Sequence, residues 1–168
     1  MISPLEWYLT ELVAQVQPIT AGQVNPVTAD VIYPDSDTVG ITLTTVEGYQ
    51  YSAGAVDHLF AIQSIAKAFT YGLALEDLGP EVVAKSVNVE PSGDAFNKIS
   101  LETDGRPDNP MITAGAIATV GLIKDQCDTK RITRISHTMQ QAAAGSPGVL
   151  EMNHDVYQVR NESRRVPG

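Results

Sequence analysis

The sequence predicts a chain of mixed α/β class, of the α+β kind, in which a helix and a β-hairpin precede a mostly helical region. Three observations support this class. Residues 3–17 have the apolar spacing of an amphipathic helix, residues 39–54 contain two β-branched runs around a turn, and most of 58–157 has helical periodicity. We therefore expect few strands and several helices.

Length and composition favour one domain. The chain has 168 residues and is 43% hydrophobic, which is enough to bury a core. We expect a single domain over 1–168. Within it, 1–57 supplies the helix and hairpin of the sheet region, 58–157 is the helical region, and 158–168 is a tail without periodicity.

The charge and the chain ends restrict the partners. With 11 basic and 20 acidic residues the formal net charge is −9, which argues against nucleic acid or an anionic membrane as the main partner. The N-terminus has no basic region and carries Glu6 and Glu11, so it does not resemble a secretory signal. No uncharged apolar run approaches the ~18 residues of a membrane span. The single cysteine, Cys127, fits a reducing compartment, and we expect a cytoplasmic protein.

The first elements follow from local signals. Ser3 at the N-cap, Pro4 at the first helical position and Glu6 three residues after the cap predict a helix over 3–17. Prolines and glycines then indicate a loop over 18–37.

A hairpin is expected next, with strands over 39–46 and 49–54 joined by a turn at Glu47-Gly48. Because an isolated two-stranded hairpin is marginally stable, it must pack on helices or pair with further strands.

Five further helices are expected downstream of the hairpin's return strand. A central helix within 58–77 is followed by a short one over 80–87. Residues 111–124 are small and apolar on nearly every side, which is typical of a buried helix. Residues 128–144 suggest an amphipathic helix with Ile132, Ile135 and Met139 on one face, and another helix is expected to begin within 150–157.

The central helix contains Ser64-Ile65-Ala66-Lys67. A three-residue step on a helix places Ser64 and Lys67 on one face, and a hydroxyl beside an amine can form a nucleophile without histidine. Alone, this pattern is more typical of an ordinary helix start with a solvent-facing lysine. The flanking segments decide between these interpretations.

Three segments occur in a characteristic order: FAIQSIAK at 60–67, EPSG at 90–93 followed by Phe96-Asn97, and NPMITAGAI at 109–117. Together they resemble the serine-dependent glutaminases of bacterial type, whose fold is that of β-lactamases and D-Ala-D-Ala peptidases. The resemblance extends over roughly 5–157.

The resemblance implies hydrolysis of L-glutamine to L-glutamate and ammonia through a γ-glutamyl-enzyme ester. Ser64 would be the nucleophile, in contact with the substrate, and Lys67 the base that activates it. No metal and no organic cofactor are implied. Members of the family are homo-oligomers, so we expect self-association.

Two residues depart from the family pattern where the substrate is held. Thr113 replaces an asparagine that contacts glutamine, and Arg160 stands where the family has a glutamate for the substrate's α-amino group. The chain also ends at roughly half the family's usual length, so the C-terminal sheet strands are expected to be missing. The alternative function is therefore an inactive glutaminase remnant that acts as a binding or assembly piece, or has no function.

Other interpretations are weaker. A penicillin-binding or β-lactamase-like enzyme shares Ser-x-x-Lys but requires a Lys-Thr-Gly element, which the sequence lacks. The three histidines lack metal-ligand spacing. The basic residues Lys130, Arg131 and Arg134 are most simply a solvated helix face.

Overall fold

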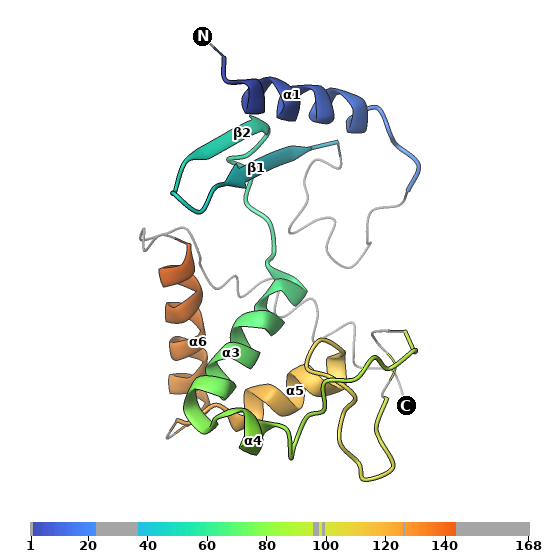
Figure 1. The fold of residues 1–168 in the computed structure, drawn as a ribbon, viewed down its shortest axis with the longest axis vertical. Helices are drawn as coiled ribbons and strands as arrows, with labels where there is room; N and C mark the ends of the chain where they lie inside the picture. Colours follow the sequence, from blue (N-terminus) through green and yellow to red (C-terminus); the bar gives the residue numbers. More distant parts are fainter. Residues whose placement is uncertain (1, 23–36, 96–97, 99, 126, 144–168) are drawn as a thin grey trace. The chain divides into compact units, whose positions relative to one another are not determined.

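The computed structural model describes residues 2–22, 37–95, 98, 100–125 and 127–143 (Figure 1). These residues divide into two compact units that separate between Ala61 and Ile62. The expectation of one domain over 1–168 stays a prediction. The helix expected to begin within 150–157 and the tail over 158–168 lie outside the described residues.

The first unit begins with α1 (Pro4–Val16), whose start is fixed by the predicted cap. The Ser3 hydroxyl accepts a hydrogen bond from the Leu5 N–H (3.3 Å), and the Glu6 carboxylate accepts one from the Ser3 N–H (3.0 Å). This reciprocal pair occupies backbone donors that have no partner within the helix.

A hairpin of β1 (Gly40–Thr44) and β2 (Gln50–Gly54) follows, with Gly40 opposite Gly54 and Thr44 opposite Gln50. The strands are shorter than predicted because residues 45–49 form the turn. Within that turn the Thr45 N–H donates to the Tyr49 carbonyl (2.9 Å).

The hairpin packs against α1, as Figure 1 shows. The core of this unit consists of Leu9, Val13 and Ala53. Packing on a helix was the expected means of stabilising a two-stranded hairpin, and the structure confirms it.

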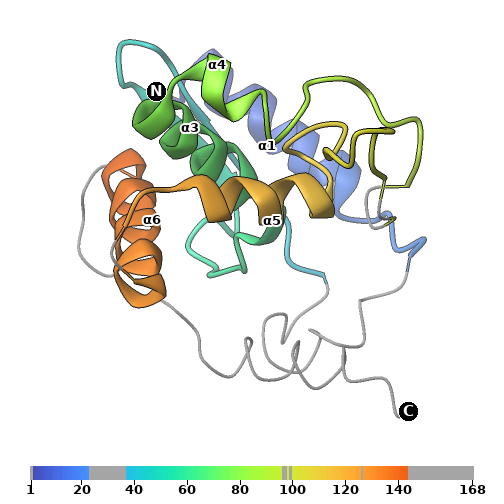
Figure 2. The same ribbon diagram turned by 90° about the horizontal axis from the view of Figure 1, so that it is seen from below.

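The second unit is helical. A 3₁₀ turn, η1 (Gln63–Ile65), leads into α3 (Ala66–Leu78), and α4 (Pro80–Val83), α5 (Thr113–Leu122) and α6 (Asp128–Ala142) follow. Helix α3 is central because α4, α5 and α6 all contact it, and both ribbon views show α5 and α6 beside it (Figures 1 and 2). The core combines side chains from α3 and α4 with one just after α5: Leu73, Ala74, Val83 and Ile123.

The predicted burial of the helix over 111–124 is only partly correct. Gly115 and Thr119 are buried, but the side chain of Ile117 is 68% exposed. A helix that is apolar on every side is therefore covered on one face, which is the face toward α3. The helix is also shorter than predicted, since the backbone is extended at Ile112 and Ile123.

Two other helices differ in detail from their predictions. Helix α4 ends at Val83, because the chain from Ala84 onward forms turns and not the rest of the predicted helix over 80–87. On α6, Met139 is buried and Ile135 packs against the core, but Ile132 is 46% exposed.

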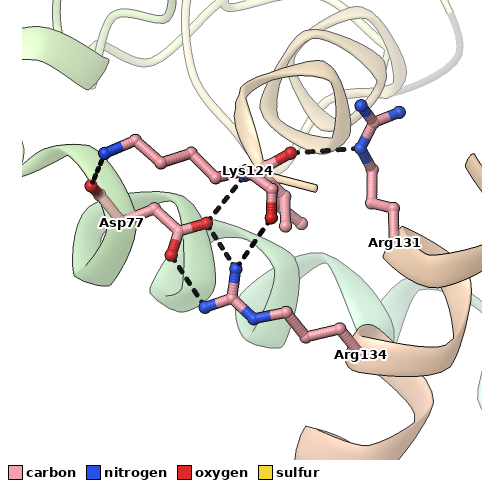
Figure 3. Close-up of polar contacts among 5 residues, drawn as sticks. Asp77, Lys124, Arg131 and Arg134 are labelled. Carbon is pink, nitrogen blue, oxygen red and sulfur yellow. Dashed lines mark hydrogen bonds and ion pairs between the residues drawn. The ribbon is translucent and has the colours of Figure 1, made fainter. Parts of the chain in front are cut away.

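A polar cluster around Asp77 joins the end of α3 and the residues just after α5 to the first half of α6 (Figure 3). Its carboxylate accepts two bonds from the Arg134 guanidinium (2.6 and 2.7 Å) and one from the Lys124 N–H (2.8 Å). The Arg134 Nη1 also donates to the Lys124 carbonyl (3.2 Å), and the Arg131 Nε donates to the Ile123 carbonyl (3.1 Å).

This cluster corrects the prediction that Arg131 and Arg134 belong to a solvated helix face. Both arginines reach back from α6 to the end of α5, and Arg134 pairs with a carboxylate that is only 10% exposed. The paired guanidinium holds the pKa of Asp77 below its ordinary value of 3.8 and raises that of Arg134.

None of the helices in the described part of the chain has both the length and the apolar character needed to cross a membrane.

Candidate active site

Ser64 lies in η1 and is exposed, and Lys67 is the second residue of α3 and is half-buried. The backbone between them is helical, with φ −58° and ψ −34° at Ile65 and φ −59° and ψ −24° at Ala66. A three-residue step through helical backbone directs Ser64 and Lys67 to the same side of the chain. Ser64, the candidate nucleophile, is therefore accessible, and Lys67, the candidate base, lies about one helical turn further along the chain.

The residue before Ser64 has unusual backbone geometry. Gln63 has φ +41°, and among the described residues it is the one non-glycine residue with a positive φ. A non-glycine residue in this region is strained by roughly 1–3 kcal/mol, and such strain is concentrated at functional sites. This is evidence for a site at Ser64 that is independent of the Ser-x-x-Lys pattern.

The amine of Lys67 is directed to a backbone oxygen. Its Nζ donates a hydrogen bond of 2.8 Å to the carbonyl of Met111, which lies 44 residues further along the chain. This bond joins the segment with Ser64 and Lys67 to the segment over 109–117.

Asn109 joins that segment to the one over 90–93. Its Oδ1 accepts from the N–H groups of Met111 (3.0 Å) and Ile112 (3.2 Å), and its Nδ2 donates to the Glu90 carbonyl (2.9 Å). A backbone bond from the Glu90 N–H to the Asp108 carbonyl (2.9 Å) supports the same junction. The three segments that are far apart in the sequence are thus connected by hydrogen bonds into one site.

Gly115 permits this arrangement. A Cβ at this position would overlap the Asn109 carbonyl oxygen and lie 3.0 Å from the Pro110 Cα. The Asn109–Pro110 backbone therefore lies against α5 at a distance that only glycine allows. The Thr119 hydroxyl donates to the Gly115 carbonyl (2.7 Å) and so occupies that acceptor.

Asp94 follows the turn over 90–93 and connects it to residues further along the chain. Asp94 accepts from the Lys98 Nζ (2.8 Å) and the Ser100 hydroxyl (2.8 Å), and both bonds keep the pKa of Asp94 below its ordinary value. The Asp94 N–H donates to the Ser92 hydroxyl (3.3 Å). This segment presents the Glu90 carbonyl to Asn109.

Of the two residues that depart from the family pattern, Thr113 lies in the described part of the chain and Arg160 does not. Thr113 is the first residue of α5 and is half-buried. Arg160 lies outside the described residues. The expected repulsion between Arg160 and the substrate's α-amino group therefore stays a prediction.

Sequence reasoning missed the contacts of Asn109 and the Met111 carbonyl. An asparagine side chain in a turn often accepts hydrogen bonds from backbone N–H groups two or three residues ahead, so Asn109 could have been recognised as the start of an Asx turn. The role of the Met111 carbonyl could not be recognised in this way, because every residue has a backbone carbonyl group.

In the described part of the chain, no group of three or more His, Cys, Asp or Glu side chains is arranged to hold a metal ion. The thiol of Cys127 is exposed and forms no disulfide. The chemical groups assembled at the site are a hydroxyl, an amine and oriented backbone amides.

Comparison with protein families identifies the chain. The model of a family described as glutaminase matches residues 22–166, which is most of the sequence. The chain belongs to the glutaminase family. Two similar glutaminases are those of Corynebacterium glutamicum, 41% identical over 83% of this chain, and Trichormus variabilis, 43% identical over 79%.

Solved glutaminase structures have the same fold as this chain. Mglu in its native form superposes with a TM-score of 0.86 at 36% identity, covering 98% of this chain and 40% of that one. The probable glutaminase YbaS gives a TM-score of 0.81 at 31% identity, covering 96% of this chain and 53% of that one. The predicted family and the mixed α/β fold are confirmed.

The glutaminase relatives are longer than this chain. It spans 34% of the C. glutamicum protein and 40% of the T. variabilis protein. The expected likeness to β-lactamases stays a prediction, because these comparisons concern glutaminases.

Proposed function

We propose that this chain supplies the nucleophile and the base for hydrolysis of L-glutamine to L-glutamate and ammonia. The observation that carries the proposal is the hydrogen bond from Lys67 to the Met111 carbonyl, which joins the Ser-x-x-Lys turn to the glutaminase segment over 109–117. Mglu in its glutamate form is also similar to this chain, with a TM-score of 0.83 at 34% identity over 97% of this chain and 38% of that one.

The reaction is a two-step acyl transfer. The Ser64 Oγ attacks the γ-carboxamide carbon of glutamine, while the Lys67 amine accepts the hydroxyl proton. That proton passes to the departing nitrogen, the C–N bond breaks, and ammonia leaves a γ-glutamyl ester on Ser64. Water then attacks the ester with Lys67 as general base, and glutamate is released as the serine hydroxyl is restored.

The local structure is suited to this chemistry. Ser64 is exposed, so a small substrate can reach it. It also lies at the start of α3, where the positive end of the helix dipole favours negative charge that develops on the attacked oxygen. These steps use only side chains, backbone groups and water.

The test is ammonia release from L-glutamine by the purified chain. We expect turnover that Ser64→Ala abolishes and that Lys67→Met lowers by about 10²- to 10⁴-fold, the usual effect of losing a general base. Lys85→Met, a change at an exposed lysine of the same unit, should keep the wild-type rate. Turnover that survives Ser64→Ala would refute the mechanism.

The second candidate is a glutaminase remnant that binds without turnover or serves assembly. The observation in its favour is Thr113 at the start of α5, where the family has an asparagine that contacts glutamine. A threonine hydroxyl lacks the donor-and-acceptor geometry of an amide. A chain that is folded by circular dichroism, binds glutamate in calorimetry and releases no ammonia would favour this function. Hydrolysis of nitrocefin would instead indicate β-lactamase-like chemistry.

Self-association and a cytoplasmic location belong to the same proposal. The supporting features are the family's oligomeric habit, the acidic composition and the unpaired thiol of Cys127. Fractionation of cells that express the chain tests the location, and recovery with the membranes would contradict it.

A further inference from the structure

One peptide group at the site is held from two sides. The carbonyl of the Met111–Ile112 peptide accepts from the Lys67 Nζ (2.8 Å), and the N–H of the same peptide donates to the Asn109 Oδ1 (3.2 Å). The peptide is planar and trans, so these two groups point in opposite directions. Rotating this plane to improve one bond would weaken the other.

Asn109 is itself held at several points. Its Nδ2 donates to the Glu90 carbonyl (2.9 Å), while its Oδ1 also accepts from the Met111 N–H (3.0 Å). Its backbone carbonyl lies against Gly115 with no space for a Cβ between them. The carboxamide therefore has a donor and an acceptor in use at once, and neither can be exchanged for the other without loss.

We propose that Asn109 is a positioning residue for Lys67. By fixing the plane of the Met111–Ile112 peptide, its carboxamide sets the direction of the carbonyl to which the lysine amine donates. The inference rests on the proposed function, in which Lys67 is the base, and it gives Asn109 no contact with the substrate. A misdirected carbonyl would leave the amine in several orientations, of which few face Ser64.

The chemistry of the carboxamide suggests a graded set of substitutions. Asn109→Ala removes both the acceptor and the donor. Asn109→Asp keeps an acceptor for the two N–H groups but replaces the donor to Glu90 with a second, negatively charged acceptor. Asn88→Ala is a matched control, because the Asn88 side chain also bonds a backbone N–H and a neighbouring side chain, those of Val89 and Glu102.

The experiment measures acetylation of Lys67 by acetic anhydride, located by peptide mass spectrometry in the full chain. The rate is divided by that of the exposed Lys85 in the same sample, which cancels differences in reagent. We expect the Lys67/Lys85 ratio to rise about three- to tenfold in Asn109→Ala, in line with the loss of one hydrogen bond. In Asn109→Asp it should stay within about twofold of wild type.

The control separates positioning from general loosening of the fold. Asn88→Ala should leave the ratio unchanged even where it lowers stability. An unchanged ratio in a folded Asn109→Ala chain overturns the proposal, and so does an equal rise in Asn88→Ala. If Asn109→Ala does not fold by circular dichroism, Asn109→Ser is used in its place. Its shorter acceptor should raise the ratio in the same direction, and no rise overturns the proposal.

A second measurement links the position of the amine to the reaction. We expect Asn109→Ala to lower kcat for glutamine hydrolysis by about 10- to 100-fold with little change in KM, because misplacement of a catalytic group affects the chemical step. A raised KM at unchanged kcat would contradict positioning and indicate substrate contact. The labelling ratio needs no turnover, so an inactive chain with a raised ratio would refute the proposed function and leave the positioning role intact.

Discussion

The clearest case of a residue chosen for its size is Gly115, where even one methyl group would overlap the Asn109 carbonyl. We expect Gly115→Ala to lower the free energy of unfolding by about 1–3 kcal/mol, the usual effect of overpacking. A Cβ added at Gly72, in the middle of α3, would have no atom within 4 Å. Gly72→Ala should therefore raise the free energy of unfolding by about 0.5–1 kcal/mol. Urea denaturation measures both, and effects of the same sign would contradict this assignment.

Thr113 offers a test of substrate contact. If the start of α5 faces glutamine, Thr113→Asn restores an amide that can both donate and accept. We expect KM for glutamine to fall about tenfold, which corresponds to roughly one hydrogen bond. Thr129→Asn, an exposed change on α6, serves as the control. Equal KM values in the two variants would remove Thr113 from the substrate site.

The site shows which residues a sequence can reveal. Ser64 and Lys67 were predicted because their spacing and flanking segments are distinctive. The acceptor of the Lys67 hydrogen bond was not predicted. It is a backbone carbonyl, which the residue type does not reveal, and only the fold brings Met111 close to Lys67. The strained φ of Gln63 was equally invisible, since glutamine gives no sign of a left-handed backbone.

At the scale of elements, α6 is held to α3 by charge as well as by apolar packing. Arg134→Met leaves the Asp77 carboxylate, 10% exposed, with fewer donors. We expect a loss of about 1–3 kcal/mol in the free energy of unfolding. The pair between Lys98 and Asp94 is more exposed, at 63% and 37%, so Lys98→Met should leave the free energy of unfolding nearly unchanged. Thermal unfolding compares the two variants, and equal losses would contradict a special role for Asp77.

The same carboxylate predicts a pH dependence. Because its pKa is lowered in the folded chain, the stability it contributes is fully present above its ordinary value of 3.8 and is lost as the pH falls from there through the folded pKa. We expect Asp77→Asn and Arg134→Met to have a flatter decline of stability below pH 3.8 than the wild type. Urea midpoints across this acid range measure the decline. A wild-type slope in Asp77→Asn would show that other groups carry the effect.

Elements with strong local signals were predicted well. The capping box at Ser3 and Glu6 and the alternating hairpin residues depend on neighbours in sequence, and both formed as expected. The error at Arg131 and Arg134 has a different cause. An arginine on the polar side of a helix is normally solvated, and only the tertiary fold brings the end of α5 within its reach.

At the scale of the whole molecule, the described chain has two cores of its own, one around Leu9 and one around Leu73. The sequence predicted a helix with a hairpin followed by a helical region, and the likeness to glutaminases confirms that fold. The sequence placed the change from the helix-and-hairpin region to the helical region at 57/58, near the division between Ala61 and Ile62. It gave no sign that the two regions form separate cores, because apolar spacing identifies a buried face but not the element that covers it.

Self-association is the prediction that belongs to this scale. Helix α1 carries Trp7 and Tyr8 at 60% and 55% exposure, and large aromatic side chains are enriched at protein interfaces. We expect light scattering after size-exclusion chromatography to give at least twice the mass of one chain. A double substitution to serine at these two positions should shift the population toward the single-chain mass. A wild-type chain that elutes with the mass of one copy at all concentrations would contradict self-association.

The hydrogen bond from Lys67 to the Met111 carbonyl determines which substitutions this site should tolerate. The atom that receives the amine belongs to the main chain, so the side chain at position 111, which is 44% exposed, can vary while the acceptor persists. Proline is the exception, because it would remove the N–H that Asn109 binds. A saturation library at this codon should therefore be permissive except for one amino acid, whereas position 109, which never touches the amine, should be restrictive.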